Sequence, residues 1–191
     1  MSSSDGLDAI AFEELARKAI AEIDPPPDVE AMQVTFNLIR AANRVQQDLE
    51  VSIHRPAGVT WAAFRILFTI FSVGPIAPAQ LARLSSVSAA SISVVLNTLE
   101  RNKMIKRRRS TTDGRSVVVE LTAKGRKTVT TLFSRNNARE SDWASALTAS
   151  ERATFTRLLR KLLTHHPSTP PDAAGKPLVP SRRYPPGQKK A

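Results

Sequence analysis

The sequence predicts a mainly helical fold that carries one small β-hairpin. Up to about residue 166, apolar residues recur three or four positions apart, which is the spacing of helices that bury one face. The exception is the basic stretch from Lys103 to Leu121, which reads as two short strands. Proline-containing breaks separate the first four helical segments, because proline cannot continue a helix. Together these observations indicate one ordinary domain with a packed core and flexible ends.

Two helices are predicted at the start of the chain. Helical spacing over residues 7–23 stops at Asp24 and three consecutive prolines, so residues 1–27 should form an acidic accessory helix followed by a stiff break. A long helix is predicted from residue 28 to about residue 53. The sequence Arg-Pro-Ala-Gly at residues 55–58 should end it.

A third and a fourth helix are predicted next. Thr60 can cap the third, which should extend to the Gly-Pro step at residues 74–75. Pro78 suits the first turn of a short fourth helix, in which Leu81 and Leu84 should face inward.

The most informative segment begins at Ser88, which can cap a fifth helix. The buried stripe of this helix should consist of Ile92, Val95, Leu96 and Leu99. Its outward face should be small and polar, with Ala89, Ala90, Ser91, Ser93, Asn97 and Thr98. Such a face suits a DNA groove, and the hairpin that follows adds the cations Lys103, Lys106, Arg107, Arg108, Arg109 and Arg115. A groove-sized helix beside a basic hairpin is the layout of a winged helix-turn-helix.

Beyond the hairpin, two further helices are predicted. Thr122 can cap one that extends towards Trp143, and Thr148 with Glu151 forms a capping box for the other. Residues 167–191 are rich in Pro, Lys and Arg, so they should form a disordered basic tail.

The charge distribution favours a polyanionic partner. The chain has 28 Lys and Arg against 17 Asp and Glu, a net charge of +11. Residues 1–30 hold eight of the acidic residues and only two of the basic ones, so the remainder of the chain is strongly basic. Charge alone would fit DNA, RNA or an anionic membrane.

Several function classes are disfavoured by composition. There is no cysteine, so we expect no disulfide, thiolate metal site or thiol switch. No apolar run has the ~20 residues of a membrane span, and the acidic start differs from a signal peptide; we therefore expect a cytoplasmic, nucleoid-associated protein without membrane contact. His54 and the adjacent pair His165 and His166 form no catalytic or metal-binding pattern. We expect no enzymatic activity, cofactor or metal.

Residues from about 34 to 163 resemble the MarR family of winged-helix transcription regulators. The resemblance is carried by the order of the helices, by the segment from Gln80 to Arg107, by Asp113 with Arg115, and by the Leu-Thr-x-x-Gly step that ends at Gly125. Each motif alone is weak, but they occur in the family's order and at its separations.

The resemblance implies a homodimer that binds double-stranded DNA. Residues 28–59 would form the first dimerisation helix, residues 60–121 the DNA-binding lobe and residues 122–166 the C-terminal dimerisation helices. Two lobes would then read half-sites about one helical turn, ~34 Å, apart. The expected function is repression that a small aromatic or phenolic ligand relieves.

The resemblance also implies roles for individual residues. Ser88, Ala89, Ser91 and Ser93 would lie near bases or backbone, and Asn97 and Thr98 nearer phosphates. Arg115 would enter the minor groove, held by Asp113 through a charge-assisted bond. The remaining wing cations would neutralise phosphates: Lys106, Arg107, Arg108 and Arg109.

The sequence departs from the family's pattern at two positions. Val94 stands where the family usually has an arginine midway along the reading helix, which removes a contact worth ~1–3 kcal/mol. Lys103 stands where the family usually has a glycine that turns the chain into the wing. We expect the preceding Asn102 to take the left-handed conformation instead.

A ligand site is a further expectation. Its candidate residues combine helix arginines with an aromatic face: Arg40, Arg44, Trp61, Phe64, Arg65 and Phe68. An arginine beside an aromatic-lined cavity would suit an aromatic carboxylate. Aromatic residues at this spacing more often form a hydrophobic core, and helix arginines more often pair with acids or solvent, so the sequence favours the core interpretation over the ligand site.

The chief alternative function is a sequence-tolerant architectural or RNA-binding protein without an inducer. The missing arginine at Val94 and the basic tail support it. Competition of labelled promoter DNA by bulk duplex DNA and by RNA would distinguish the two functions.

Overall fold

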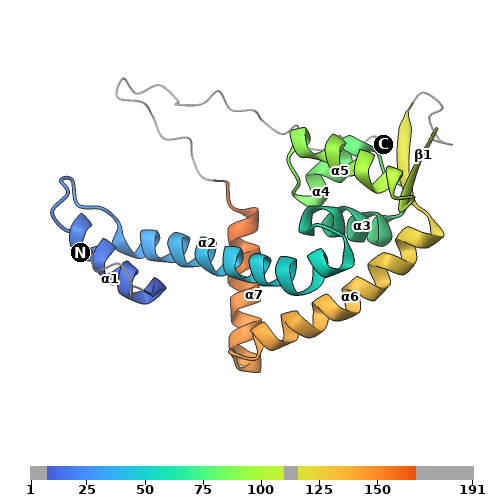
Figure 1. Cartoon of the computed structure of the whole chain (residues 1–191). Coiled ribbons are helices and arrows are strands. Elements are labelled where there is room, and N and C mark those ends of the chain that lie inside the picture. Colours follow the sequence, from blue (N-terminus) through green and yellow to red (C-terminus); the bar gives the residue numbers. More distant parts are fainter. Residues whose placement is uncertain (1–7, 110–115, 167–191) are drawn as a thin grey trace, which may run out of the picture. The chain divides into compact units, whose positions relative to one another are not determined.

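The computed structural model describes residues 8–109 and 116–166. These residues divide into two compact units, one up to Trp143 and the other from Ala144 on. The described part of the chain is predominantly helical with one antiparallel hairpin, as predicted (Figure 1). No single helix within these ranges is long and apolar enough to cross a membrane, although one pair bent by 80°, Val29–Ala57 with Trp61–Val73, meets the requirement for length and composition.

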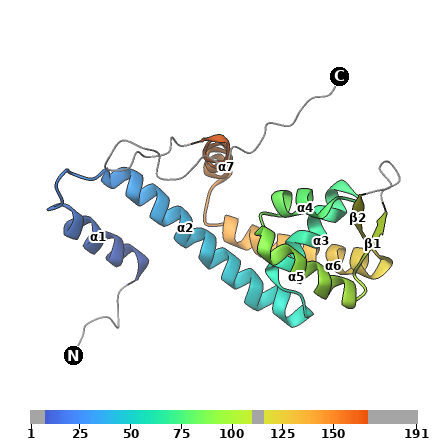
Figure 2. The same cartoon turned by 90° about the horizontal axis from the view of Figure 1, so that it is seen from above.

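The first unit begins with α1 (Ala9–Ile20) and α2 (Val29–Leu49) (Figure 2). The prolines separate them as predicted, although Ile23 lies beyond the end of α1. α2 continues through a π-helical turn, Glu50–His54, and a 3-10 turn, Arg55–Ala57. Gly58 then ends the long helix with a φ of 69°.

The next elements are α3 (Trp61–Val73), α4 (Pro78–Ser85), α5 (Ala89–Arg101), β1 (Ile105–Arg109), β2 (Val117–Leu121) and α6 (Ala123–Ala144). The predicted caps are confirmed, since the side chains of Thr60 and Ser88 accept hydrogen bonds from the first turns of α3 and α5. Between α4 and α5 the chain turns at Ser86, which has a φ of 50°.

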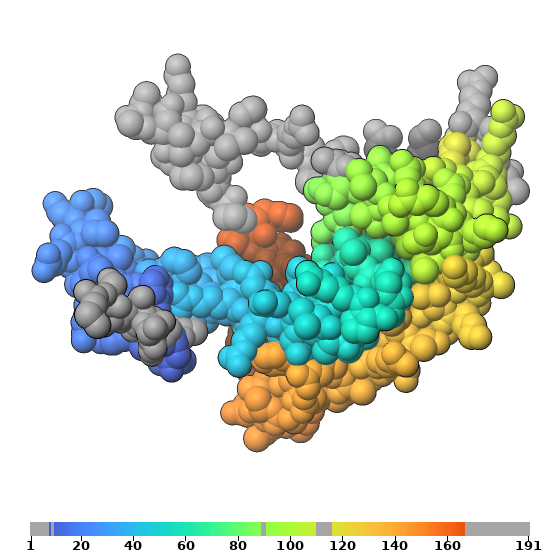
Figure 3. Space-filling model, in the orientation of Figure 1, coloured from blue at the N-terminus to red at the C-terminus, as the bar shows by residue number. Residues whose placement is uncertain are grey.

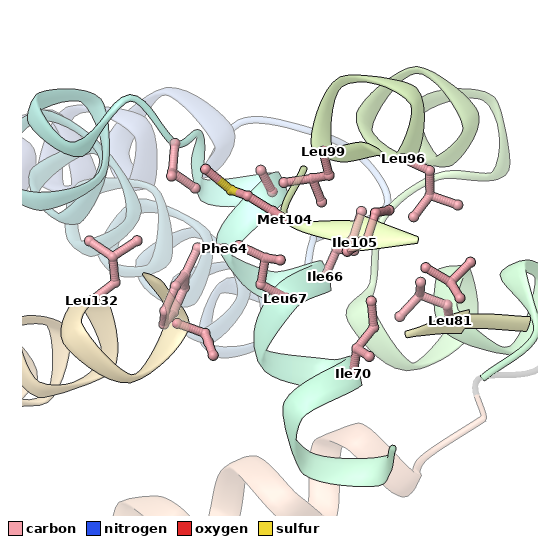
Figure 4. Packing of buried hydrophobic residues seen from close by; sticks show 14 of the residues in the cluster. Phe64, Ile66, Leu67, Ile70, Leu81, Leu96, Leu99, Met104, Ile105 and Leu132 are labelled. Carbon is pink, nitrogen blue, oxygen red and sulfur yellow. The ribbon is translucent and has the colours of Figure 1, made fainter. Parts of the chain in front are cut away.

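The core of the first unit is centred on α3. Ile66 and Leu67 are fully buried and Ile70 nearly so, and they face the α5 residues Leu96 and Leu99 (Figure 4). α2 is tied to α6 by Asp48, whose carboxylate accepts hydrogen bonds from Arg139 at 2.7 and 2.9 Å and from Trp143 Nε1 at 2.7 Å. The bonds to Arg139 and Trp143 lower the pKa of Asp48 to about 2.

The hairpin pairs Ile105 with Leu121, Lys106 with Glu120 and so on to Arg109 with Val117. Ile76 extends the sheet by an antiparallel bridge to Val119, which anchors the hairpin to the segment before α4.

The Leu-Thr-x-x-Gly step joins the hairpin to α6. Thr122 Oγ1 accepts a bond from Gly125 N at 3.0 Å and donates to Lys103 O at 2.7 Å. Met104 O accepts from Thr122 N at 3.0 Å and lies directly against Gly125, where a Cβ atom would be 1.9 Å from it. The glycine is therefore required by a close backbone approach rather than by a turn.

Two expectations are wrong. Leu84 is 53% exposed, and Ser85 is buried in its place beside Leu81, because positions 81 and 85 are nearly aligned on a helix. Asn102 keeps a φ of −78°, whereas Lys103 takes the left-handed conformation with a φ of 58°.

The described part of the second unit contains α7 (Ala149–Thr164), which begins with the predicted capping box of Thr148 and Glu151. Its large apolar side chains are exposed in this single chain: Phe155, Leu158, Leu162 and Leu163.

Candidate nucleic-acid interface and ligand cavity

α5 has one buried face and one small, polar face. The buried face contains Ile92, Leu96 and Leu99, as predicted, and Val95 is half-buried. Of the residues predicted to face outward, Ser91, Ser93 and Asn97 are exposed, Thr98 is half-buried, and Ala89 and Ala90 belong to the first turn of the helix. Val94 is 67% exposed, so an apolar side chain stands on the outer surface.

Two serines define the start of α5. Ser88 Oγ accepts a bond from Ser91 N at 3.2 Å and donates to Ser91 Oγ at 2.8 Å. Both residues are exposed. Ser88 and Ser91 therefore lie at the N-terminal end of α5.

α5 and β1 share one continuous stretch of surface (Figure 3). Successive side chains of a strand point to opposite faces of the sheet, so the four cations of β1 divide into two pairs. Lys106 and Arg108 lie on one face. Arg107 and Arg109 lie on the other, which is also the face of the buried residue Ile105.

Glu120 holds the first pair of cations. Its carboxylate lies 2.9 Å from Lys106 Nζ and 2.6 Å from Arg108 Nε. The hydrogen bonds from Arg108 and Lys106 lower the pKa of Glu120. Glu120 was not predicted from the sequence as part of this site, although the strand register places it directly opposite Lys106.

Arg107 joins the hairpin to α5. Its Nη1 donates to Glu100 Oε2 at 2.6 Å, and its Nη2 donates to Asn97 Oδ1 at 2.8 Å. Asn97 and Glu100 are three residues apart, which places them on the same side of the helix. Glu100 was also missed from the sequence, because its partner is on the neighbouring strand.

Of the other predicted DNA-binding residues, the structure describes some and leaves others out. Arg109 is exposed at the end of β1. Thr98 is half-buried on α5 and donates its hydroxyl to Val94 O at 3.1 Å. Asp113 and Arg115 lie outside the described residues.

A cavity of about 280 Å³ opens between α3, the end of α4 and α6. Four predicted ligand-site residues line it on α3: Trp61, Phe64, Arg65 and Phe68. The residues that α4 and α6 contribute were not predicted from the sequence: Leu84, Ser85, Phe133, Asn136 and Glu140. These lie on other helices, so helical spacing within α3 could not reveal them.

Aromatic rings form a ladder along this cavity. The ring centroids of Trp61 and Phe64 are 6.0 Å apart, as are those of Phe64 and Phe68, and Phe68 stacks on Phe133 at 5.2 Å with an interplanar angle of 2°. Burial lowers the pKa of Arg65, which lines the same cavity. The cavity therefore combines flat apolar walls with a partly desolvated cation.

Arg40 and Arg44 do not line this cavity. The guanidinium of Arg40 lies over Phe12 of α1 at 4.7 Å and over Phe36 at 5.6 Å from the ring centroids. That of Arg44 lies 5.5 Å from the Trp143 ring.

His54 lies behind the aromatic ladder and is fully buried. Its ring centroid is 4.7 Å from that of Phe64, and its Nε2 is 3.0 Å from Asn136 Oδ1. Asn136 Nδ2 donates to Glu140 Oε1 at 2.5 Å, so Asn136 presents its oxygen to the histidine. Burial lowers the pKa of His54, which favours the neutral ring with a proton on Nε2. Within the described ranges, His54 Nδ1 has no hydrogen-bond partner.

The described residues contain no group of three or more His, Asp or Glu side chains that could hold a metal ion. A second cavity, of about 220 Å³, lies between the start of α3 and the side of α5. Its lining is largely apolar and includes Val59, Val94 and Leu99.

Comparisons with known proteins agree with this arrangement. The model of the MarR family matches residues 59–117. YwaE of Bacillus subtilis, an uncharacterized HTH-type transcriptional regulator, is 30% identical over 135 residues, which span 71% of this chain and 79% of that protein.

Two solved structures show the likeness in three dimensions. The MarR family protein Rv2887 of Mycobacterium tuberculosis, in complex with salicylic acid, has a TM-score of 0.56 at 27% identity and covers 73% of this chain and 98% of its own. A mutant of Escherichia coli MarR in complex with operator DNA has a TM-score of 0.64 at 24% identity, covers 70% of this chain and 96% of its own, and shares the fold. Fold, motifs and sequence identity together place this chain in the MarR family of transcriptional regulators.

Proposed function

We propose that this protein is a homodimeric repressor that binds a pseudo-palindromic duplex with two α5 helices in successive major grooves. The observation that carries the proposal is the small, exposed, polar face of α5 next to the basic strand β1. A helix fits the major groove, and the strand supplies cations for the flanking phosphates. Operator DNA is the partner of the Escherichia coli MarR mutant, which has the same fold.

Within this interface, Ser88, Ala89, Ser91 and Ser93 would approach base edges. They cannot form the bidentate contacts of arginine, and Val94 offers only an apolar surface that suits a thymine methyl group. Sequence readout would therefore depend on short contacts and DNA shape.

Contacts outside the base edges would fix the position of the protein on the duplex. Asn97, Thr98 and Arg109 would approach phosphates, as would Lys106 and Arg108 beside Glu120. In the minor groove, Arg115 supported by Asp113 remains our proposed contact.

Dimer formation would cover the apolar surface that each unit exposes by itself. α2 exposes Phe36 and Ile39 on one side, and α7 exposes Phe155, Leu158 and Leu162. Such residues mark an interaction surface when they occur together on one face. A two-fold dimer would bury the same surface on both copies.

Footprinting on genomic fragments enriched by the protein tests the proposal. Two protected half-sites with centres about 10 bp apart are expected. A single footprint, or equal competition by bulk duplex DNA or RNA, would instead favour a sequence-tolerant architectural or RNA-binding protein. Sedimentation equilibrium of the free protein should give a dimer; a monomer at the binding concentration would contradict the proposal.

We also propose that a small aromatic acid occupies the α3–α6 cavity and weakens DNA binding. The volume of about 280 Å³ and the stacked rings suit one planar ring. Arg65 would pair with its carboxylate, and Glu140 could accept a bond from a ring hydroxyl. Salicylic acid is the molecule bound to Rv2887. The proposed anchor of the carboxylate is therefore Arg65, which lines the cavity, and no longer Arg40.

Thermal-shift and DNA-binding measurements with salicylate, benzoate and phenol test this site. Salicylate should stabilise the protein and weaken DNA binding by about 5–150-fold, the range of typical allosteric coupling. Arg65→Gln should abolish both effects, whereas Arg40→Gln is the matched control and should retain them. Loss in the control alone, or equal responses of both variants, would exclude Arg65 as the anchor.

A further inference from the structure

Arg107 differs from the other cations of β1 in what it contacts. Both of its bonded nitrogens are committed to α5, to Glu100 at 2.6 Å and to Asn97 at 2.8 Å. On the opposite face, Lys106 and Arg108 contact Glu120 within the hairpin itself. The side chain of Arg107 thus connects the hairpin to α5.

The bond to Asn97 determines which way that amide points. Arginine is a donor without an acceptor, so Asn97 must turn its Oδ1 towards Arg107. Its Nδ2, with two hydrogens, then points away from Arg107, on an exposed part of α5. The arrangement follows from the chemistry of arginine and does not depend on how the amide is assigned. DNA phosphates and many base edges are acceptors, so the outward amide has the matching polarity.

We propose that Arg107 is a positioning residue, which locks the wing strand to α5 and makes Asn97 present its N–H donors to an acceptor on DNA. This inference rests on the proposed function and gives Arg107 a different task from phosphate neutralisation. Its fork is suited to the task because a planar guanidinium can hold two oxygens at once, whereas lysine offers a single point charge. Glu100 completes the lock by fixing the other arm of the fork.

The two roles predict different effects of Glu100→Gln on selectivity. If Arg107 only neutralises phosphate, removing Glu100 frees it, and affinity for every duplex rises with no change in selectivity. If Arg107 positions Asn97, removing Glu100 loosens the lock. The ratio of affinity for a selected duplex to that for a scrambled duplex then falls, although the added positive charge favours non-specific binding.

The probes are a duplex selected by the parent protein from a random-sequence library and a scrambled duplex of the same length and composition. Arg107→Lys should lower the affinity ratio by about tenfold, equivalent to ~1.4 kcal/mol, while the salt dependence stays unchanged because the charge is kept. The matched control is Arg101→Lys on the exposed surface at the end of α5, which should leave the ratio unchanged. Melting temperatures of all variants establish that they are folded.

A double-mutant cycle tests whether Arg107 acts through Asn97. Asn97→Ala should lower the ratio in the parent but add little to Arg107→Lys, because the two residues form one unit. Three results would overturn the proposal. The first is additive losses in the cycle, and the second is an affinity ratio preserved within about twofold in Arg107→Lys. The third is a salt slope reduced by about one in Arg107→Ala without loss of selectivity. If the parent selects no sequence at all, the proposed function itself is wrong, and that result is seen before any variant is made.

Discussion

Replacing Gly125 by alanine should destabilise the first unit by about 3 kcal/mol, although alanine is the better helix former by about 1 kcal/mol. An added Cβ would lie 1.9 Å from Met104 O and 2.9 Å from Met104 C. Real Cβ atoms essentially never come closer than 3.0 Å to such atoms, so the backbone around Met104 or the start of α6 must move. A movement of at least about 1 Å is large in a close-packed interior.

The magnitude follows from what that movement disturbs. Met104 O accepts a bond from Thr122 N at 3.0 Å, which contributes ~0.5–1.5 kcal/mol, and it shares the single hydroxyl hydrogen of Thr122, at 3.2 Å, with Lys103 O at 2.7 Å. Overpacking adds ~1–3 kcal/mol. The gain in helix propensity offsets only part of this loss.

Urea unfolding followed by circular dichroism, at one protein concentration, measures the effect. The melting temperature should fall by about 6–12 °C for a chain of this size. Gly58→Ala is the control, because Gly58 has a φ of 69° but no atom within 4 Å of the place where a Cβ would lie, so the variant incurs only the ~1–2 kcal/mol cost of the left-handed conformation. If Gly125→Ala is no less stable than Gly58→Ala, the close approach does not constrain the fold.

Three further predictions concern stability. Lys103→Gly should stabilise the protein by about 0.5–1 kcal/mol, because glycine adopts positive φ freely, whereas Asn102→Gly should give no gain; urea midpoints that rank them in the reverse order would be inconsistent with the turn. The pKa of His54 is lowered in the folded protein, so the unfolded chain binds the His54 proton more tightly, and the unfolding free energy should fall as the pH drops below 6.5. His54→Gln should flatten this dependence between about pH 8 and about pH 5. An unchanged slope in the variant would count against the role of His54. Leu81→Ala should cost about 2–5 kcal/mol and Leu84→Ala much less, since Leu81 is buried and Leu84 is 53% exposed; similar melting temperatures would contradict the packing of α4.

The helices could be predicted because their signals are local. Thr60, Ser88 and Thr148 each cap the helix that follows them, and proline or glycine marks the breaks before α2, α3 and α4. Because these signals are local, they could not show that Leu84 faces outward. Spacing shows that Leu81 and Leu84 are neighbours on the helix surface, but which side of Leu81 meets the core depends on the packing of α4 against α3, α5 and β2. In the structure that side carries Ser85, whose hydroxyl donates to Leu81 O at 2.7 Å.

The candidate site was predictable where one element supplies it and unpredictable where partners come from another. The exposed serines of α5 and the aromatic residues of α3 follow from helical spacing. The carboxylates that hold the β1 cations do not, because Glu100 lies on α5 and Glu120 on β2. Asn102 is chemically suited to positive φ, yet it caps the end of α5 with a φ of −78°, and the reversal falls one residue later, on Lys103.

The corner between α5 and β1 is held from outside by α6 and by the residues just before it. Lys124 Nζ donates to Asn102 O at 3.0 Å, Thr122 bonds to the carbonyls of Lys103 and Met104, and Gly125 packs on Met104.

The small side chains of α5, our proposed reading helix, explain why this corner should matter. A long arginine at position 94 could reach a base from several helix positions, but serine and alanine reach only atoms that lie directly against the helix. With Val94 there instead, a small displacement of α5 would remove the proposed base contacts, because α5 has no long side chain at that position to restore them. Arg107 and the Gly125 contact act on the two sides of the same corner, one from the strand and one from α6. Loosening either should therefore reduce selectivity for DNA more than it reduces the general attraction to phosphate, which depends on net charge.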